Sequence, residues 1–266
     1  MRSHHTQRYV TTRSTKIAFV AMLGTAALFL SLAPTYAQDK ITPEEIIRRM
    51  DKNHVFESRE SYTIMRIHRY GRTRESHMRS YSKGEDSSYT EFLSPARDKG
   101  IKYLKLRNNL WMYMPSAEKV LKISGHMLRQ SMMGSDFSYE DMLDSTALRD
   151  RYNKELVGEE AVNGQLCYVL KLTQKNPGET YPTRKVWIHK TQFVTLKSEL
   201  FAVSGRLLKV MMLSNVKQYG ERYYPTVVRM ENKLRRGTWT EVTMKTIKFK
   251  VQLPEQIFSL RNLQRD

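Results

Sequence analysis

The sequence predicts a mainly β (α+β) protein: a strongly curved antiparallel sheet, or unclosed β-barrel, of about 10–11 strands with helices covering its concave face. Beyond one amphipathic helix, most of the chain alternates polar and apolar residues with period two. Turn signals join successive runs as hairpins without strand–helix–strand alternation, so we expect antiparallel pairing. Several runs are apolar on both faces, which favours a sheet that curls rather than one with a wet face.

The helix opens the region that follows residue 40. Thr42 suits the N-cap, Pro43 suits the first helical position, and Glu45 completes a capping box. A stripe at helical spacing then predicts which face is buried. The stripe consists of Ile46, Ile47, Met50 and His54.

The extended runs predict a series of hairpins. Asn163-Gly164 is the strongest turn signal, because both residue types accept the positive φ angles of a two-residue loop. Gly71-Arg72, Asn108-Asn109 and Ser204-Gly205 mark further turns. The runs are 62–70, 75–83, 101–107, 110–114, 152–160, 165–173, 193–203, 206–216, 223–234 and 238–251. A terminal tail, 254–266, is expected to dock through Ile257, Phe258 and Leu260.

The first 37 residues have the order of a cleavable signal peptide. A basic start without acids precedes a 16-residue apolar run, 17–32, and small residues at Thr35 and Ala37 predict cleavage after Ala37. The alternative is an uncleaved anchor, but the run is shorter than the roughly 20 residues that span a bilayer. We therefore expect residues 1–37 to be removed and residues 38–266 to form a single domain in the periplasm.

The cysteine count and the net charge limit the compartment and the classes of binding partner. Cys167 is the only cysteine, so no intrachain disulfide can form, and export without disulfides favours a bacterial periplasm. After loss of four basic residues with the leader, 41 Lys and Arg against 27 Asp and Glu give a net charge of +14. Export disfavours nucleic acid as partner, which leaves an anionic membrane surface. The alternative is a basic surface that only maintains solubility.

A methionine-rich segment, 111–143, is the most informative part of the chain. Its six methionines are Met112, Met114, Met127, Met132, Met133 and Met142. Methionine is unbranched and polarizable, so it adapts to partners of irregular shape. The segment therefore suits a soft apolar pocket, although ordinary core packing is the alternative for any one methionine.

Catalytic and metal-binding patterns are absent from the sequence. None of the seven histidines has a partner at zinc-site spacing, and Gly134-Ser135-Asp136 lacks the glycine pattern of a nucleophile elbow. The acids Asp136, Glu140, Asp141 and Asp144 are close together, but Ser138 with Asp141 indicates a helix start instead. We expect no enzyme activity, no cofactor and no metal; an exported hydrolase is the alternative, without a residue to assign to it.

The motifs PEEIIRRMDKN (43–53), WMYMP (111–115) and GSDFSYED (134–141), with the signal peptide and the hairpins, resemble the LolA-like outer-membrane lipoprotein-sorting proteins. The resemblance implies an unclosed β-barrel with a helical lid over an apolar cavity. It implies a carrier of lipoprotein or other lipid acyl chains, between an inner-membrane transporter and an outer-membrane acceptor. For this branch it also suggests an exporter of the resistance-nodulation-division type as partner.

On this basis we expect an apolar cavity and lid with Arg129 at the rim for a head group, and Gly125 and Gly134 as hinges. The expected ligand-binding residues are Trp111, Tyr113, Met127, Leu128, Met132, Met133, Phe137, Met142 and Leu143. The alternative function is a non-enzymatic periplasmic interaction module, accessory to a membrane exporter and without lipid cargo.

Overall fold

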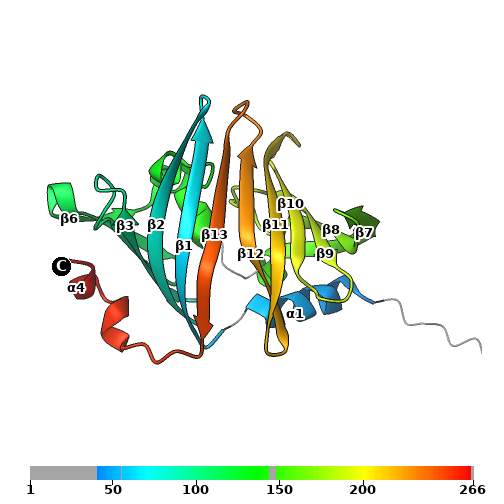
Figure 1. The fold of residues 1–266 in the computed structure, drawn as a ribbon. Coiled ribbons are helices and arrows are strands. Elements are labelled where there is room, and N and C mark those ends of the chain that lie inside the picture. The colour runs from blue at the N-terminus through cyan, green and yellow to red at the C-terminus, as the bar shows by residue number, and fades with distance from the viewer. Residues whose placement is uncertain (1–40, 55, 144–147, 265–266) are drawn as a thin grey trace, which may run out of the picture. The chain divides into compact units, whose positions relative to one another are not determined.

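A computed structural model describes residues 41–54, 56–143 and 148–264; the expected signal peptide and Asp144 lie outside these residues. Thirteen strands form one antiparallel sheet in the order β6-β5-β4-β3-β2-β1-β13-β12-β11-β10-β9-β8-β7 (Figure 1). The two ends of this sheet, β6 and β7, are not paired with each other, so the barrel is unclosed. The predicted fold class is confirmed, with more strands than expected.

The strands before residue 125 are β1 (Ser58–Arg69), β2 (Arg72–Lys83), β3 (Ser87–Ser94), β4 (Lys102–Leu106), β5 (Asn109–Met114) and β6 (Lys119–Ile123). The strands after residue 143 are β7 (Tyr152–Val162), β8 (Gln165–Gln174), β9 (Thr183–His189), β10 (Thr195–Phe201), β11 (Leu207–Tyr219), β12 (Arg222–Asn232) and β13 (Trp239–Phe249). The helices are α1 (Pro43–His54), η1 (Pro115–Ala117), η2 (Gly125–Arg129), η3 (Met132–Gly134), α2 (Tyr139–Leu143), α3 (Leu148–Arg151), η4 (Glu255–Phe258) and α4 (Leu260–Leu263).

Successive strands pair as hairpins in both series, and β1 with β13 joins the two series. The Asn163-Gly164 turn is confirmed, with φ angles of 50° and 78°. The β1–β2 turn lies one residue earlier than expected, at Tyr70-Gly71, because Arg69 pairs with Arg72. The strands that the sequence pattern missed are β3, β6 and β9.

Helix α1 covers one part of the concave face. The backbone N–H of Glu45 donates to Oγ1 of Thr42 at 3.2 Å, so the predicted N-cap is confirmed. The Glu45 carboxylate, however, binds the guanidinium groups of Arg48 and Arg49 instead of closing the capping box. The apolar face of α1 packs on β7–β9. The cluster that results consists of Ile46, Ile47, Met50, Tyr152, Leu170, Leu172, Val186 and Ile188.

The C-terminal tail covers part of the opposite face. Phe258 and Leu263 pack against Tyr89, Leu104 and Tyr113 of β3, β4 and β5. The expectation for Leu260 is wrong, since 44% of this residue is exposed while Leu263 is fully buried. Among the residues described, no helix is long and apolar enough to cross a membrane.

The two leucines at the ends of α4 provide a test of tail docking. Leu263→Ala should lower the free energy of unfolding by about 2–5 kcal/mol, because it opens a cavity in a packed cluster. Leu260→Ala, on the exposed side of the same helix, should change it by less than about 0.5 kcal/mol. Urea denaturation measures both, and equal effects of the two substitutions would contradict the docking of the tail.

Candidate functional site

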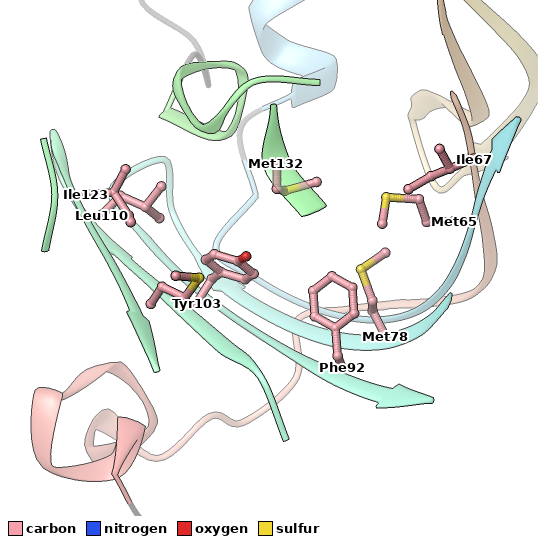
Figure 2. Packing of buried hydrophobic residues seen from close by; sticks show 9 residues of the cluster. Met65, Ile67, Met78, Phe92, Tyr103, Leu110, Ile123 and Met132 are labelled. Atoms are coloured by element: carbon pink, nitrogen blue, oxygen red, sulfur yellow. The ribbon is translucent and has the colours of Figure 1, made fainter. Parts of the chain in front are cut away.

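A lid, which we define as residues 125–143 and which contains η2, η3 and α2, covers the concave face of β1–β6. Under it lies a cluster of Met65, Ile67, Met78, Phe92, Tyr103, Leu110, Met112 and Ile123, completed by Met132 from the lid itself. Figure 2 shows the curved strands placing these side chains around Met132. The lid residues packed against this cluster are Met127, Leu128, Met133, Phe137, Tyr139, Met142 and Leu143.

The lid is seated less deeply than the sheet residues beneath it. Met132 is buried, whereas Met127, Leu128, Met133 and Phe137 keep part of their surface exposed. Gly125 and Gly134 have φ angles of +56° and +71°, which favour glycine. The structure therefore brings together seven of the nine apolar residues expected at the site, in a lid that is only partly buried.

Two carboxylates fix the lid to the sheet. Asp136 is buried and accepts hydrogen bonds from the hydroxyl groups of Thr238 and Thr240, each at 2.8 Å. The Asp136 backbone N–H donates to Oγ1 of Thr240 at 2.8 Å. Because these bonds reach the start of β13, Asp136 ties the middle of the lid to the centre of the sheet.

Asp141 provides the second anchor. Its carboxylate accepts from the Lys209 ammonium at 2.6 Å, from the Tyr181 hydroxyl at 2.9 Å and from the Ser138 backbone N–H at 2.7 Å. The Ser138 hydroxyl accepts from the Asp141 backbone N–H at 3.4 Å, so the predicted helix start is a reciprocal capping box. Burial, and then the charge of Asp141, raise the pKa of Tyr181 above its ordinary range, which keeps its hydroxyl a donor.

Two cavities adjoin where the lid and α1 leave the concave face uncovered. The first, here called the polar cavity, has a volume of about 370 Å³ and runs from Leu128 and Leu143 of the lid to the chain at 179–184. The second, the α1 cavity, has a volume of about 170 Å³ and lies beside Met50, with Met211 and Leu213 on its sheet side. Both are lined by Arg184, so they meet at this side chain.

Arg184 is buried and held by aromatic rings. Its Nε donates to the Tyr152 hydroxyl at 2.9 Å, and its guanidinium lies 4.9 Å from the ring centre of Tyr152 and 5.4 Å from that of Tyr181. A guanidinium in this position has an orientation set by the protein before any ligand arrives. It therefore presents a fixed positive group at the junction of the two cavities.

The polar cavity has charged walls of both signs. Its basic lining residues are Lys105, Arg107, Arg151 and Arg184, and its acidic ones are Glu85, Asp86, Glu140 and Glu179. Arg151 pairs with Glu179 at 2.5 Å. The α1 cavity is different, since half of its lining is apolar: Met50, Leu148, Val186, Met211 and Leu213. The two cavities thus differ in polarity, with Arg184 in the lining of both.

The structure separates Trp111 and Tyr113 from the other expected ligand-binding residues. Both belong to the cluster under the C-terminal tail, on the opposite face of the sheet. Side chains alternate along β5, so Leu110 and Met112 face the lid while Trp111 and Tyr113 face away. The expectation that Trp111 and Tyr113 lie beneath the lid is therefore wrong, and Met112 is the residue of WMY that faces the lid.

Arg129 also lies elsewhere than expected. It is an exposed residue at the end of η2 and lines neither of the two cavities. The basic residues that line the polar cavity include Arg184, Lys105 and Arg151 instead. Arg184 was not predicted as a site residue because the strand that carries it, β9, was not predicted. Met211 and Leu213 could have been predicted as lining residues from the apolar residues on both faces of β11.

Two of the acids considered for catalysis, Asp136 and Asp141, anchor the lid. Asp136 and Asp141 are both engaged by hydroxyl, ammonium or backbone donors. Among the described residues, no group of three or more His, Cys, Asp or Glu side chains could hold a metal ion. The arrangement is suited to binding an amphipathic molecule.

Comparison with known proteins gives a family and a fold. A family model described as "Uncharacterized protein" matches residues 84–265. An outer membrane lipoprotein-sorting protein domain from Vibrio parahaemolyticus is 25% identical, with a TM-score of 0.76 over 84% of this chain and 98% of its own. A DUF1329 family protein from Desulfovibrio piger is 29% identical, with a TM-score of 0.77 over 83% and 97%.

A LolA superfamily protein from Nitrosomonas europaea is 24% identical, with a TM-score of 0.70 over 84% of this chain and all 100% of its own. No curated protein matches the chain. The residues matched by the family model include the lid.

Breaking the Asp141 anchor should destabilise the protein. Asp141→Asn leaves the Lys209 ammonium, which is 10% exposed, without its counter-charge. We expect a loss of about 3–5 kcal/mol in the free energy of unfolding. Glu255→Gln removes an exposed pair with Lys83 and should cost less than about 1 kcal/mol. Urea denaturation compares the two, and similar small effects would show that Asp141 does not hold the lid.

His54, which lines the α1 cavity, should make stability depend on pH. Burial, and secondarily the charge of Arg59, lower its pKa from 6.5 to about 4. Between these values the unfolded chain binds a proton that the folded protein does not, so the free energy of unfolding falls as pH falls from 6.5 toward 4. His54→Gln should flatten this slope in urea titrations, while His126→Gln, at an exposed position, should leave it unchanged.

Proposed function

The chain belongs to the family whose model matches residues 84–265 and shares the fold of the LolA-like outer membrane lipoprotein-sorting domains, and we propose that it is a periplasmic carrier. In this proposal it shields acyl chains of a lipoprotein or another lipid during transfer between the inner and the outer membrane. The signal-peptide pattern of residues 1–37 supports export to the periplasm with cleavage after Ala37. The donor is an inner-membrane transporter or exporter, and the acceptor lies in the outer membrane.

The observation behind this proposal is the pair of cavities that meet at Arg184 between the two covers of the concave face. The polar cavity, at about 370 Å³, falls within the roughly 300–1,000 Å³ of ligand pockets. The α1 cavity, at about 170 Å³, is smaller than that range. An acyl chain therefore needs more apolar space than the α1 cavity alone provides.

The lid can supply the remaining space. Lifting it uncovers the apolar cluster on β1–β6, while each lid side chain that leaves the cluster is replaced by part of the acyl chain. Removing an acyl methylene from water stabilises the complex by about 0.8 kcal/mol, comparable to what the lid loses per exposed methylene. Because Met127, Met133 and Met142 are only partly buried, this exchange is close to balanced, which allows release as well as binding.

In this proposal, basic side chains at the cavities orient the ligand by binding its head group. Arg184 and Lys105 are buried beside the polar cavity, where a phosphate or carboxylate group would be held. The acyl chain would then extend from this head group toward Met211 and Leu213 or beneath the lid. Arg129, outside both cavities, is left as a contact for a bulky head group or a membrane.

A second candidate, an interaction module without lipid cargo, is favoured by one observation. The cluster beneath the lid is already filled by the protein's own side chains, including Met132. In this alternative the basic surface would bind a membrane-exporter partner and the lid would stay closed. Native mass spectrometry of the protein purified from its host separates the two: bound lipid mass supports the carrier, and protein mass alone supports the module.

A substitution that fills the α1 cavity tests the carrier directly. Met211→Trp should weaken binding of a fluorescent fatty acid by tenfold or more, about 1.4 kcal/mol, because the indole occupies the space of the acyl chain. The matched control is Val210→Trp, which places the same ring on the opposite face of β11 and should leave the affinity unchanged. Fluorescence titration measures both affinities. Equal affinity of Met211→Trp and the native protein would contradict an acyl site in this cavity.

A further inference from the structure

Three neighbouring hairpin turns lie along one edge of the sheet. The strands β2-β1, β13-β12 and β11-β10 are adjacent in the sheet order, and each pair is joined by a turn at this same edge, at the top of Figure 1. The turns and their flanks comprise residues 69–74, 233–237 and 202–206, which we name the docking edge. Since neighbouring strands are about 4.8 Å apart, successive turns are about 10 Å apart along the sheet.

Each of the three turns exposes one large apolar side chain. Tyr70 and Val203 are each 88% exposed, and Leu234 is 54% exposed. Of the large apolar residues of the described chain, Tyr70 and Val203 are the most exposed. Single exposed apolar residues are ordinary, but one at the tip of each of three adjacent hairpins places them along one line.

The same edge is strongly basic. Its 16 residues include seven Lys or Arg and no Asp or Glu. Arg72, Arg206, Arg235 and Arg236 are exposed. Lys233 forms an ion pair with Glu231, just outside the edge, and Arg74 lies 4.0 Å from Asp98, so the edge keeps a large positive excess. An arrangement of exposed cations around apolar tips is complementary to an anionic bilayer surface.

Tyr70 occupies a position at which tyrosine is unusual. Its φ angle of 51° lies in the left-handed region, which a hairpin turn normally fills with Asn, Asp or Gly. The guanidinium of Arg69 lies 5.5 Å from the Tyr70 ring centre. A tyrosine with an adjacent cation suits the interface between water and lipid head groups, where aromatic rings with a polar end are favoured.

We propose that the docking edge binds anionic phospholipid bilayers, with Tyr70, Val203 and Leu234 entering the head-group layer and the surrounding basic residues contacting phosphates. The apolar side chains project from three separate turns rather than forming one continuous patch. This arrangement favours a surface that each tip enters independently over a single protein contact. The binding requires no cargo, so this proposal and the carrier function fail separately.

Vesicle co-sedimentation of the mature protein, residues 38–266, tests the proposal. We expect binding to vesicles of phosphatidylcholine with ~30% phosphatidylglycerol at an ionic strength of about 0.15 M, and at least tenfold weaker binding to phosphatidylcholine alone. The variant Arg72→Gln/Arg235→Gln/Arg236→Gln should bind anionic vesicles at least tenfold less. The variant Tyr70→Ser/Val203→Ser/Leu234→Ser should show a similar loss.

Matched controls separate the edge from overall charge and hydrophobicity. Lys171→Gln/Lys217→Gln/Lys245→Gln removes the same charge from exposed positions elsewhere and should lower binding by less than threefold. Val157→Ser/Leu166→Ser removes two exposed apolar residues elsewhere and should leave binding unchanged. Circular dichroism of each variant verifies that it is folded.

A probe on the tip tests insertion itself. Cys167 is fully buried, so Leu234→Cys provides the accessible thiol for an environment-sensitive dye. Its emission should shift to the blue with anionic vesicles, whereas dye at Leu166→Cys should not shift. The proposal is overturned if the native protein does not prefer anionic vesicles, if the charge control loses as much binding as the edge variant, or if the dye at position 234 is unshifted. The first result would leave an acidic protein as the partner of this edge.

Discussion

The structure depends on how the concave face of one wide sheet is covered. Pairing of β1 with β13 places two hairpin series side by side, and each series has its own apolar cluster on that face. Helix α1 covers one cluster and the lid covers the other. No single short helix could bury both, because an apolar helix face covers only a few strands. The uncovered junction is where the two cavities and Arg184 lie.

The two covers are held by different interactions. Helix α1 is fixed by buried apolar side chains, with Ile46 and Ile47 at 0% and 1% exposure. The lid presents partly buried methionines, and its most specific attachments are the polar ones at Asp136 and Asp141. Polar anchors are directional and define one seated position, whereas methionine contacts tolerate displacement. This difference makes the lid the part of the cover that is easier to displace.

The sequence predicted what local patterns determine. The N-cap at Thr42, the helix start at Ser138 and the Asn163-Gly164 turn each depend on neighbouring residues, and each is present. What was missed depends on distant pairing. The face to which Trp111 points follows from the register of β5 with β4 and β6. The position of Arg184 follows from the pairing of β9 with β8 and β10. Because side chains alternate along a strand, assigning the wrong face to one residue of β5 assigns the wrong face to all of them. This is why Met112 faces the lid, whereas Trp111 and Tyr113 were expected there.

The same pairing also connects the lid to the basic edge of the sheet. Arg69, at the end of β1, donates a hydrogen bond at 3.2 Å to the Gly134 carbonyl in the lid. Arg74 of β2 lies so near Gly134 that a Cβ there would come within 3.3 Å of its guanidinium. Phosphate groups that attract these two arginines would compete with their contacts to the lid, because a guanidinium has a limited number of donors. A bilayer at this edge would therefore weaken the lid at η3 while leaving the Asp141 anchor, at its far end, in place.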